Sequence, residues 1–186
     1  MVNISHNAGF RVSTHVSNTA DFHNAIIAGV DEIAHLPIDT LPIAMKDVKK
    51  AARRKIVVIT TCSLAETAPP SIVPKSLLSP VLNTYKENIK RLHKAGVPLA
   101  IGSDNPMDSS LDELLYLQKM GVLDNLNLLK IWTETTPKTI FPKRKIGVLN
   151  SGYEASFLAL EGNPIEDINN IRKIKLRFKQ GNVLRF

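Results

Sequence analysis

Hydrophobic and polar positions in the first two thirds of the chain follow two alternating periods. The runs "RVSTHV" (11–16) and "VDEIAHL" (30–36) alternate with a period of two, whereas "KIVVITTC" (55–62) and "VPLAIGSD" (97–104) are almost continuously apolar. Helical patterns separate these runs, over 19–29, 43–55 and 81–96. Strands that alternate with helices are typical of βαβ units, so the sequence predicts an α/β fold with a parallel sheet.

The pattern changes near Pro142. Before it, a loop with four prolines covers 69–80, and two closing helices are expected over 111–121 and 125–141. After it, three short runs read as an antiparallel hairpin element, namely "EASFLALEG", "IRKIKLRFKQG" and "NVLRF". We therefore expect two domains, 1–142 and 143–186. The first residues, "VNISHNAGFRV", predict the end of a helix that leads into a strand, with Gly9 after the helix.

Composition limits the class of protein. The chain has 186 residues with 44% hydrophobic content, enough for a buried core. The single cysteine, Cys62, excludes an internal disulfide and a cysteine-based zinc site, and it fits a reducing, cytoplasmic environment. No apolar run reaches the ~20 residues that span a bilayer, so no membrane partner is expected. A signal peptide on a preceding segment would change the expected location.

The positive charge is unevenly distributed along the chain. Residues 1–137 hold 14 Lys/Arg and 13 Asp/Glu, whereas residues 138–186 hold 10 and 4. This basic tail lacks interleaved aromatic residues for base stacking, so we expect no specific nucleic-acid binding, although a binding module that uses the tail stays an alternative. Alternation in "RKIKLRFK" predicts that five cations occupy one exposed strand face: Arg172, Lys173, Lys175, Arg177 and Lys179.

Three polar residues end predicted strands. His15 and His35 end the first two strands, and Asp104 ends the fourth in "IGSDNP". Sites in parallel α/β folds form at the carboxyl ends of strands, where two imidazoles and a carboxylate suit a divalent metal that activates water. Any one of them alone is more often structural: a strand-end His is commonly a hydrogen-bonded core residue, and Asp before Asn-Pro is a common turn residue.

Other polar residues are weaker candidates for the same end of the sheet. Thr60, Thr61 and Ser63 follow the third strand and can hydrogen-bond a substrate, as can Asn105. Ser103 and Asn105 flank Asp104 and can orient it. Cys62 reads as a packed core thiol rather than a pocket residue. The remaining histidines lie on helical patterns and are expected to be solvated: His6, His23 and His93.

Three segments carry a family resemblance. "VSTHVSNTADFHNAIIAGVDEIAHLP" resembles the strand 5 to strand 6 segment of the metal-dependent amidohydrolases, especially imidazolonepropionase and its prolidase-like relatives. "NIKRLHKAGVPLAIGSDNP" is similar to their helix 7 to strand 8 segment. "WTETTPKTI" with "IGVLNSGYEASFLALEGNPIEDI" resembles their C-terminal signature. The resemblance covers essentially the whole chain.

The resemblance implies a fold and roles. The fold would be the C-terminal half of a (β/α)8 barrel, strands 5 to 8, followed by C-terminal strands of a small β-sandwich. His15 matches the strand 5 metal ligand, and His35 the strand 6 histidine that binds a second metal or polarises the substrate. Asp104 matches the strand 8 aspartate that binds metal and activates water. Asp104 and His35 would be catalytic, with one or two divalent ions, zinc above all, in the complete enzyme.

The sequence also departs from the family pattern. It contains no His-x-His pair, strands 1 to 4 have no counterpart, and Ala155-Ser156 stands where Ala-Asp is usual. The implied parent activity is metal-dependent hydrolysis of a non-peptide C–N bond in a small molecule, a cyclic amide or a dipeptide-like amide. A separate or missing N-terminal half is then the expected partner. A catalytically inactive fragment or pseudoenzyme is the alternative.

Overall fold

The computed structural model describes residues 1–105, 107 and 109–185. The chain divides into two compact units, Met1–Val122 and Leu123–Phe186, which are described separately below. The domain boundary expected at 142/143 stays a prediction. Within the described residues, no helix combines the length and the apolar character needed to cross a bilayer.

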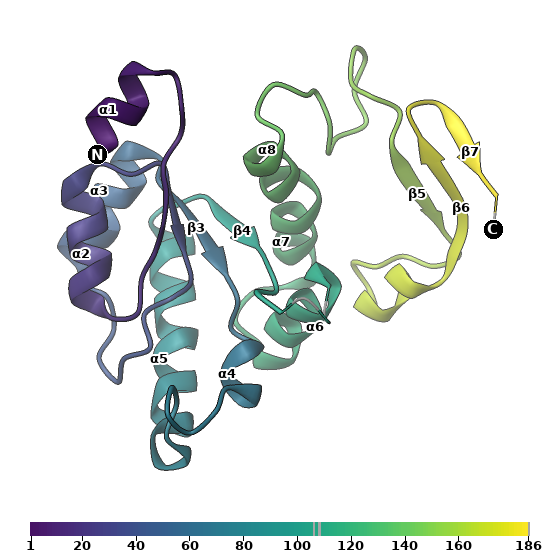
Figure 1. Ribbon diagram of the computed structural model, residues 1–186. Coiled ribbons are helices and arrows are strands. Elements are labelled where there is room, and N and C mark those ends of the chain that lie inside the picture. Colours follow the sequence, from purple (N-terminus) through teal and green to yellow (C-terminus); the bar gives the residue numbers. More distant parts are fainter. Residues whose placement is uncertain (106, 108, 186) are drawn as a thin grey trace. The chain divides into compact units, whose positions relative to one another are not determined.

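A four-stranded parallel sheet forms the centre of the first unit (Figure 1). Its strands follow in chain order: β1 (Ser13–His15), β2 (Glu32–Ala34), β3 (Val57–Thr60) and β4 (Leu99–Ile101). The strands are in register, since Thr14 pairs with Ile33, Ile33 with Val58, and Val58 with Leu99. The predicted α/β class with a parallel sheet is therefore confirmed. Because the strands are parallel, the carboxyl ends of β1 to β4 lie at the same edge of the sheet.

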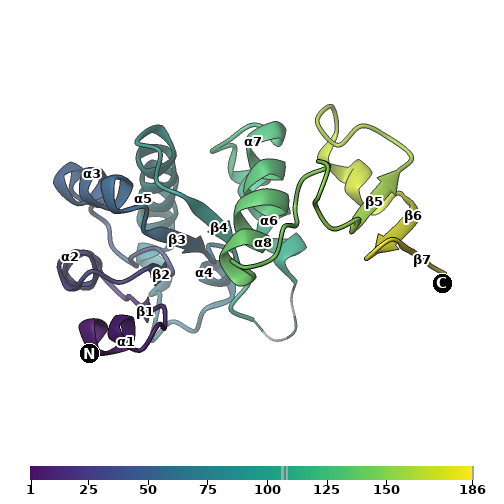
Figure 2. The same cartoon turned by 90° about the horizontal axis from the view of Figure 1, so that it is seen from above.

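Helices connect these strands. Figures 1 and 2 show α2, α3 and α5 along one face of the sheet. The helices of this unit are α1 (Val2–Asn7), α2 (Thr19–Ala28), α3 (Met45–Arg54), α4 (Leu64–Thr67), α5 (Lys75–Lys94) and α6 (Ser110–Met120). Asn18 caps α2 by accepting the N–H of Asp21 at 2.9 Å, and Gly29 ends it in the left-handed conformation.

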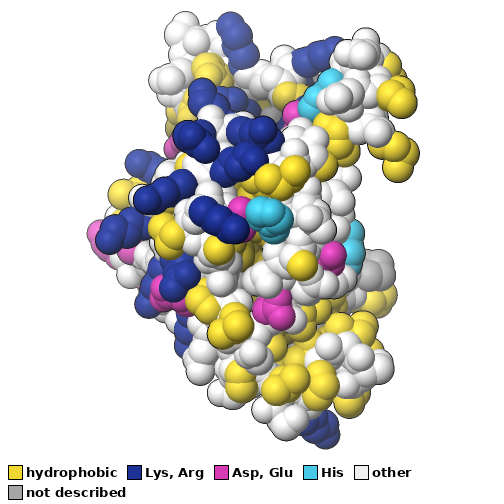
Figure 3. All heavy atoms as spheres, turned by 90° about the vertical axis from the view of Figure 1, so that its left-hand side faces the viewer, with side chains coloured by type: hydrophobic (Ala, Val, Ile, Leu, Met, Phe, Trp, Pro, Cys, Tyr) yellow, Lys and Arg dark blue, Asp and Glu magenta, His cyan; other side chains and the backbone are white. Residues whose placement is uncertain are grey.

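The core lies between the sheet and these helices. Phe22 and Ile26 of α2, Ile33 of β2, Val58 of β3 and Ile89 of α5 are completely buried. Burying each such side chain stabilises the fold by about 1.5–3 kcal/mol relative to leaving it in water. On the outer side of α3, Lys and Arg side chains gather instead (Figure 3). Helix α3 is thus strongly amphipathic, with its apolar side toward the sheet.

Two helical assignments from sequence need correction. Helix α5 begins at Lys75 rather than at 81, and Pro80 lies inside it. Pro80 is the sixth residue of α5 and lies beyond the first turn, whose N–H groups have no partner within the helix, so it removes one intrahelical hydrogen bond, the one to the carbonyl of Ser76. The short helix α4 was not expected, because it lies in a stretch that reads only as the start of a proline-rich loop.

The second unit begins with a continuous helical stretch that contains a π-helical turn. Helix α7 (Asn125–Lys130), the π-helix η1 (Ile131–Thr135) and α8 (Thr136–Ile140) follow one another without a break. The hydroxyl of Thr136 donates to the Ile131 carbonyl at 2.8 Å across this turn. Gly147 lies against it: a Cβ there would stand 2.3 Å from the Thr133 carbonyl oxygen, and its φ is +92°. Only glycine fits that position.

A three-stranded antiparallel sheet completes the second unit. Its elements are β5 (Phe157–Leu160), the 3₁₀ helix η2 (Ile168–Arg172), β6 (Ile174–Lys179) and β7 (Asn182–Leu184), with strand order β5-β6-β7. The rings of Phe157 and Phe178 stack across β5 and β6 at 4.4 Å. The small antiparallel element predicted after Pro142 is therefore present.

The basic tail follows its predicted strand pattern only in part. Lys175, Arg177 and Lys179 alternate along β6 with apolar residues, and Lys175 and Lys179 are exposed. Arg172 and Lys173 were expected on the same strand face, but they precede the strand because η2 extends to Arg172. The absence of specific nucleic-acid binding stays a prediction.

Candidate functional site

His15, His35 and Asp104 lie together beyond the carboxyl ends of the parallel strands. His15 is the last residue of β1, His35 directly follows β2, and Asp104 follows β4 by three residues. The two imidazole rings meet edge to face, with centroids 4.7 Å apart and planes at 68°. Nε2 of His35 is 3.7 Å from Oδ2 of Asp104. His35 is therefore close to both of the others.

The backbone of this cluster is strained at two of its three residues. His35 has φ +76° and Asp104 has φ +53°, the left-handed region that side chains other than glycine rarely adopt. Such a conformation costs about 1–3 kcal/mol and persists only where the surrounding structure enforces it. For His35, part of that restraint is its N–H, which donates to the Ile59 carbonyl at 3.1 Å.

The ring of His35 is held from its other side. Its Nδ1 lies 2.8 Å from the Thr61 hydroxyl, which leaves Nε2 to face Asp104. Burial lowers the pKa of His35, the nearby Asp104 carboxylate opposes that shift, and His15 adds to it. The neutral ring is therefore favoured near pH 7. When Nδ1–H donates to Thr61, Nε2 carries the lone pair that a metal ion requires.

His15 is more exposed than His35. Its Nε2 lies 3.0 Å from the Ser17 hydroxyl, so one ring nitrogen already has a polar neighbour. Asp104 is also open to solvent, with half of its side chain exposed, against 17% for His35. Water and a small molecule can therefore reach the carboxylate of Asp104 and the ring of His15.

The donor types at this cluster fit a divalent metal such as zinc, which binds imidazole nitrogens and carboxylate oxygens. Nε2 of His35 and Oδ2 of Asp104, both of ligand type, face each other at 3.7 Å. The described residues nevertheless form no group of three or more His, Cys, Asp or Glu side chains placed to hold an ion. The cluster provides metal-binding groups but not a complete metal centre.

A buried carboxylate supports the loop beside this cluster. Glu113 of α6 is fully buried, and its two oxygens accept the backbone N–H groups of Cys62 and Ser63, each at 2.8 Å. Burial raises the pKa of Glu113, and the N–H groups of Ser63 and Cys62 oppose that shift. We call the two hydrogen bonds from residues 62 and 63 to Glu113 the clamp. Thr61 directly precedes these residues, so Glu113 fixes the loop that presents the Thr61 hydroxyl to His35.

Sequence reasoning missed Glu113. A signal was present: Glu113 shares one helix face with Leu114 and Leu117, which are both buried. An acid within an apolar stripe must be paired or hydrogen-bonded, because burying an isolated charge is costly. The partner could not be identified from sequence, since it lies about 50 residues away in a loop.

The other candidate residues have mixed outcomes. The N–H of Ser63 donates to Glu113, and Oδ1 of Asn105 accepts the N–H of Met107 at 3.0 Å. Substrate binding by Thr61, Ser63 and Asn105 stays a prediction. Cys62 is buried, as expected, and burial raises the pKa of its thiol well above the usual range.

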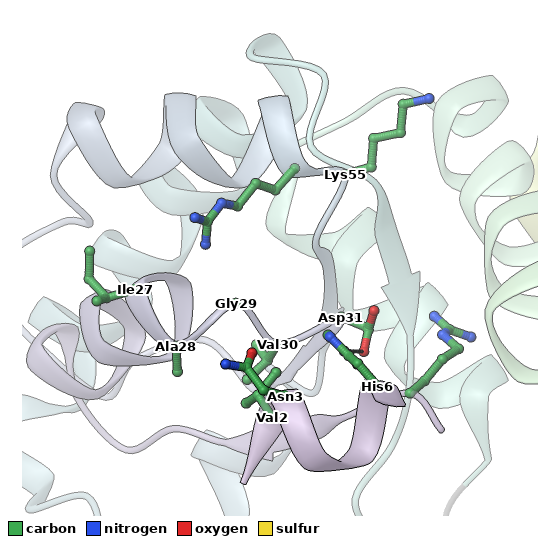
Figure 4. A pocket seen from close by; sticks show the side chains of 11 residues that line it. Val2, Asn3, His6, Ile27, Ala28, Gly29, Val30, Asp31 and Lys55 are labelled. Atoms are coloured by element: carbon green, nitrogen blue, oxygen red, sulfur yellow. Dashed lines mark hydrogen bonds and ion pairs between the residues drawn. The ribbon is translucent and has the colours of Figure 1, made fainter. Parts of the chain in front are cut away.

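Two histidines expected to be merely solvated have carboxylate partners. Nδ1 of His23 lies 2.9 Å from Asp47, and Nε2 of His6 lies 2.8 Å from Asp31. The second pair lines an open hollow of about 600 Å³, where His6 of α1 points toward the Asp31 carboxylate (Figure 4). This hollow is bounded by residues that precede β1, β2 and β3, so it lies at the opposite end of the sheet from His15, His35 and Asp104.

Comparisons with known proteins agree with this architecture. The Amidohydrolase family profile matches residues 1–184. Ochratoxinase from Aspergillus niger is 29% identical over 172 residues, which cover 88% of this chain and 35% of that enzyme. The crystal structure of A. niger ochratoxinase superposes with a TM-score of 0.81 at 26% identity, covering 98% of this chain and 43% of that one.

A second structural relative shows the same fold. The crystal structure of a Xaa-Pro dipeptidase with bound methionine in the active site gives a TM-score of 0.80 at 23% identity, covering 100% of this chain and 47% of that one. The chain thus spans about a third of the curated relative's length and less than half of these two solved chains. The family match over almost every residue, with the parallel sheet beneath it, shows that the chain belongs to the amidohydrolase family.

Proposed function

We propose that this chain contributes one part of the active site of a metal-dependent hydrolase that cleaves non-peptide C–N bonds in small molecules, either cyclic amides or dipeptide-like amides. The observation that carries the proposal is the convergence of His15, His35 and Asp104 at the carboxyl end of the sheet, in a chain of the amidohydrolase family. In this proposal the four-stranded sheet is half of a (β/α)8 barrel, strands 5 to 8, and the antiparallel sheet belongs to a β-sandwich.

Each residue has a distinct role in this proposal. His15, His35 and Asp104 would each contribute a ligand to a divalent ion, which would lower the pKa of bound water and polarise the amide carbonyl. Asp104 is the exposed carboxylate of the cluster, so it is placed to take a proton from water and pass it to the leaving nitrogen. Thr61 keeps Nδ1 of His35 occupied, so that Nε2 faces the reaction site.

The chain alone is expected to be a poor catalyst. It has no His-x-His pair, and its described residues form no three-donor group placed to hold an ion, so in this proposal additional ligands come from another polypeptide segment. Ligand misplacement of even 1 Å costs orders of magnitude in rate. Both edges of the sheet, β1 and β4, also lack a neighbouring strand among the described residues, which is where such a segment would add its own strands.

The test combines a binding and an activity measurement. Zinc titration by calorimetry should show weak binding to the chain, and weaker binding still after His35→Asn. Cyclic-amide and dipeptide hydrolysis should be negligible for the chain alone and should appear when a polypeptide carrying the missing strands is co-expressed. Turnover near ~10 s⁻¹ by the chain alone, abolished by a chelator, would show that it is an enzyme in its own right.

The second candidate function is a catalytically inactive fragment or pseudoenzyme. The same incomplete donor set favours it. It predicts that no complementing segment restores hydrolysis, although the chain still folds. The co-expression experiment therefore separates the two candidates.

A further inference from the structure

The outer surface of α3 and α5 contains a groove with an unusual charge. It has a volume of about 1020 Å³ and lies between the two helices. Six cations line it: Lys46, Lys49 and Arg53 from α3, and Lys90, Arg91 and Lys94 from α5. The only acid in the described lining is Glu87. Figure 3 shows this concentration of Lys and Arg on one face of the molecule.

This cluster is not a consequence of a basic first unit. Residues 1–122 hold 13 Lys/Arg and 11 Asp/Glu, which is close to neutral. The groove takes six of those cations and one acid, which leaves 7 cations and 10 acids elsewhere in the unit. The groove thus carries a formal charge of +5 on a unit that is otherwise acidic. Like charges gathered in one place repel, so an anionic partner would relieve a cost that the folded chain otherwise bears.

Most of this charge is available to a partner. Arg91 is engaged, because its Nε donates to Glu87 at 2.7 Å and its Nη1 donates to the Ile43 carbonyl at 3.1 Å. In the described part of the chain, the other five cations form no ion pair. Spacing of three and four residues places Lys46, Lys49 and Arg53 on one side of α3, over about 10 Å of helix.

The lining also indicates the kind of partner. Its apolar residues are Met45, Ala52 and Ala95, and Met45 is 43% exposed. A groove that combines apolar side chains with cations from both helices matches an amphipathic helix with an acidic edge, and helix-in-groove binding is a common mode of recognition. The described lining has no aromatic residue on which nucleic-acid bases could stack. A second copy of the chain, with a net charge of +7, would be repelled.

We propose that the groove between α3 and α5 binds an amphipathic, acidic helix of a partner polypeptide. The carboxylates of that helix, spaced by three or four residues, contact the cations of both rims, and its small apolar residues pack on Met45, Ala52 and Ala95. Figure 2 shows α3 and α5 on one side of the sheet, and the lining of the groove includes none of His15, His35 and Asp104.

The test uses a fluorescein-labelled 15-residue peptide, designed as a helix with one Glu face and one Ala/Leu face, and the full 186-residue chain. Fluorescence anisotropy should show binding that weakens several-fold between ~50 and ~150 mM NaCl, because exposed charges are screened. The triple variant Lys49→Glu, Arg53→Glu, Lys90→Glu should lose at least ~10-fold in affinity, since charge reversal places like charges across the interface.

A matched control variant has the same net charge as the groove variant. The triple variant Lys143→Glu, Lys175→Glu, Lys179→Glu changes three exposed tail cations and should alter affinity by less than ~3-fold. Circular dichroism should show that both variants are folded. Equal losses in the two variants would overturn the proposal, as would equal binding of a scrambled peptide or no binding of the designed one. A 20-nucleotide oligonucleotide that binds more tightly than the peptide at ~150 mM salt would also overturn it.

Discussion

Replacing Glu113 by alanine should destabilise the first unit more than replacing any exposed acid. The change leaves the N–H groups of Cys62 and Ser63 without the carboxylate oxygens that accept them at 2.8 Å. Each buried N–H without a partner costs about 1–3 kcal/mol. Because Ser63 is only half-buried and water can reach it, we expect a total loss of about 2–5 kcal/mol in the free energy of unfolding. Glu113→Gln keeps one acceptor and should lose about 1–3 kcal/mol.

Urea unfolding followed by far-ultraviolet circular dichroism measures this loss. With a slope of roughly 2 kcal/mol per M, the midpoint of Glu113→Ala should fall by about 1–2.5 M. Tryptophan fluorescence is unsuitable, because Trp132, the only tryptophan, lies in the second unit. Glu66→Ala is the matched control. Glu66 is exposed and, among the described residues, accepts only the Tyr116 hydroxyl, at 3.1 Å, so the variant should lose less than about 1 kcal/mol in the free energy of unfolding.

A second measurement connects the clamp to the candidate site. Loosening residues 62 and 63 should displace Thr61, and therefore change the hydrogen bond between its hydroxyl and Nδ1 of His35. Nitrogen-15 chemical shifts of the His35 ring should change in Glu113→Ala and stay constant in Glu66→Ala. The reasoning is refuted if the two variants unfold at the same urea concentration, or if the ring shifts of His35 are the same in Glu113→Ala and the unmodified chain.

Three further predictions concern other positions. In the complemented enzyme, Asp104→Asn should lower amide hydrolysis by about 10²–10⁴-fold without changing the thermal midpoint of assembly, since proton transfer contributes that much to rate. Burial lowers the pKa of His35 below 6.5, so as the pH falls this imidazole is protonated in the unfolded chain before it is protonated in the folded one. The free energy of unfolding should therefore decrease from about pH 7 downward, and His35→Asn should show a smaller decrease. Gly147→Ala should cost more than about 2 kcal/mol, because its Cβ meets the Thr133 carbonyl at 2.3 Å, whereas Gly152→Ala, with φ +79° and open space, should cost about 1 kcal/mol.

The parts of the fold that follow local patterns were predictable. The alternating run "RVSTHV" contains strand β1, the apolar run "KIVVITTC" contains β3, and the helical pattern over 19–29 forms α2. The convergence of His15, His35 and Asp104 follows from the same logic, because parallel strands end at one edge of a sheet. Their chemical roles do not follow from strand order; the family resemblance implies them.

Features that depend on distant segments were not predictable. Nothing near Glu113 indicates that it would accept two N–H groups from residues 62 and 63. The sequence did not predict the cationic groove, because its charges are split between 46–53 and 90–94 and residues 1–122 as a whole hold 13 Lys/Arg and 11 Asp/Glu. The sequence directs attention to the basic tail instead. Local charge density is set by helix packing, which brings α3 and α5 together.

The left-handed backbone at His35 and Asp104 limits how this cluster can be redesigned. Apart from glycine, the residues that accept such a backbone most readily are Asn, Asp and His, whereas Glu and Cys gain no such tolerance. A saturation library at these two positions, selected only for folding, should therefore be enriched in Gly, Asn, Asp and His before any metal is added. Two of those four residue types are metal ligands, so the chain's geometry retains candidate ligands here even when selection for catalysis is absent.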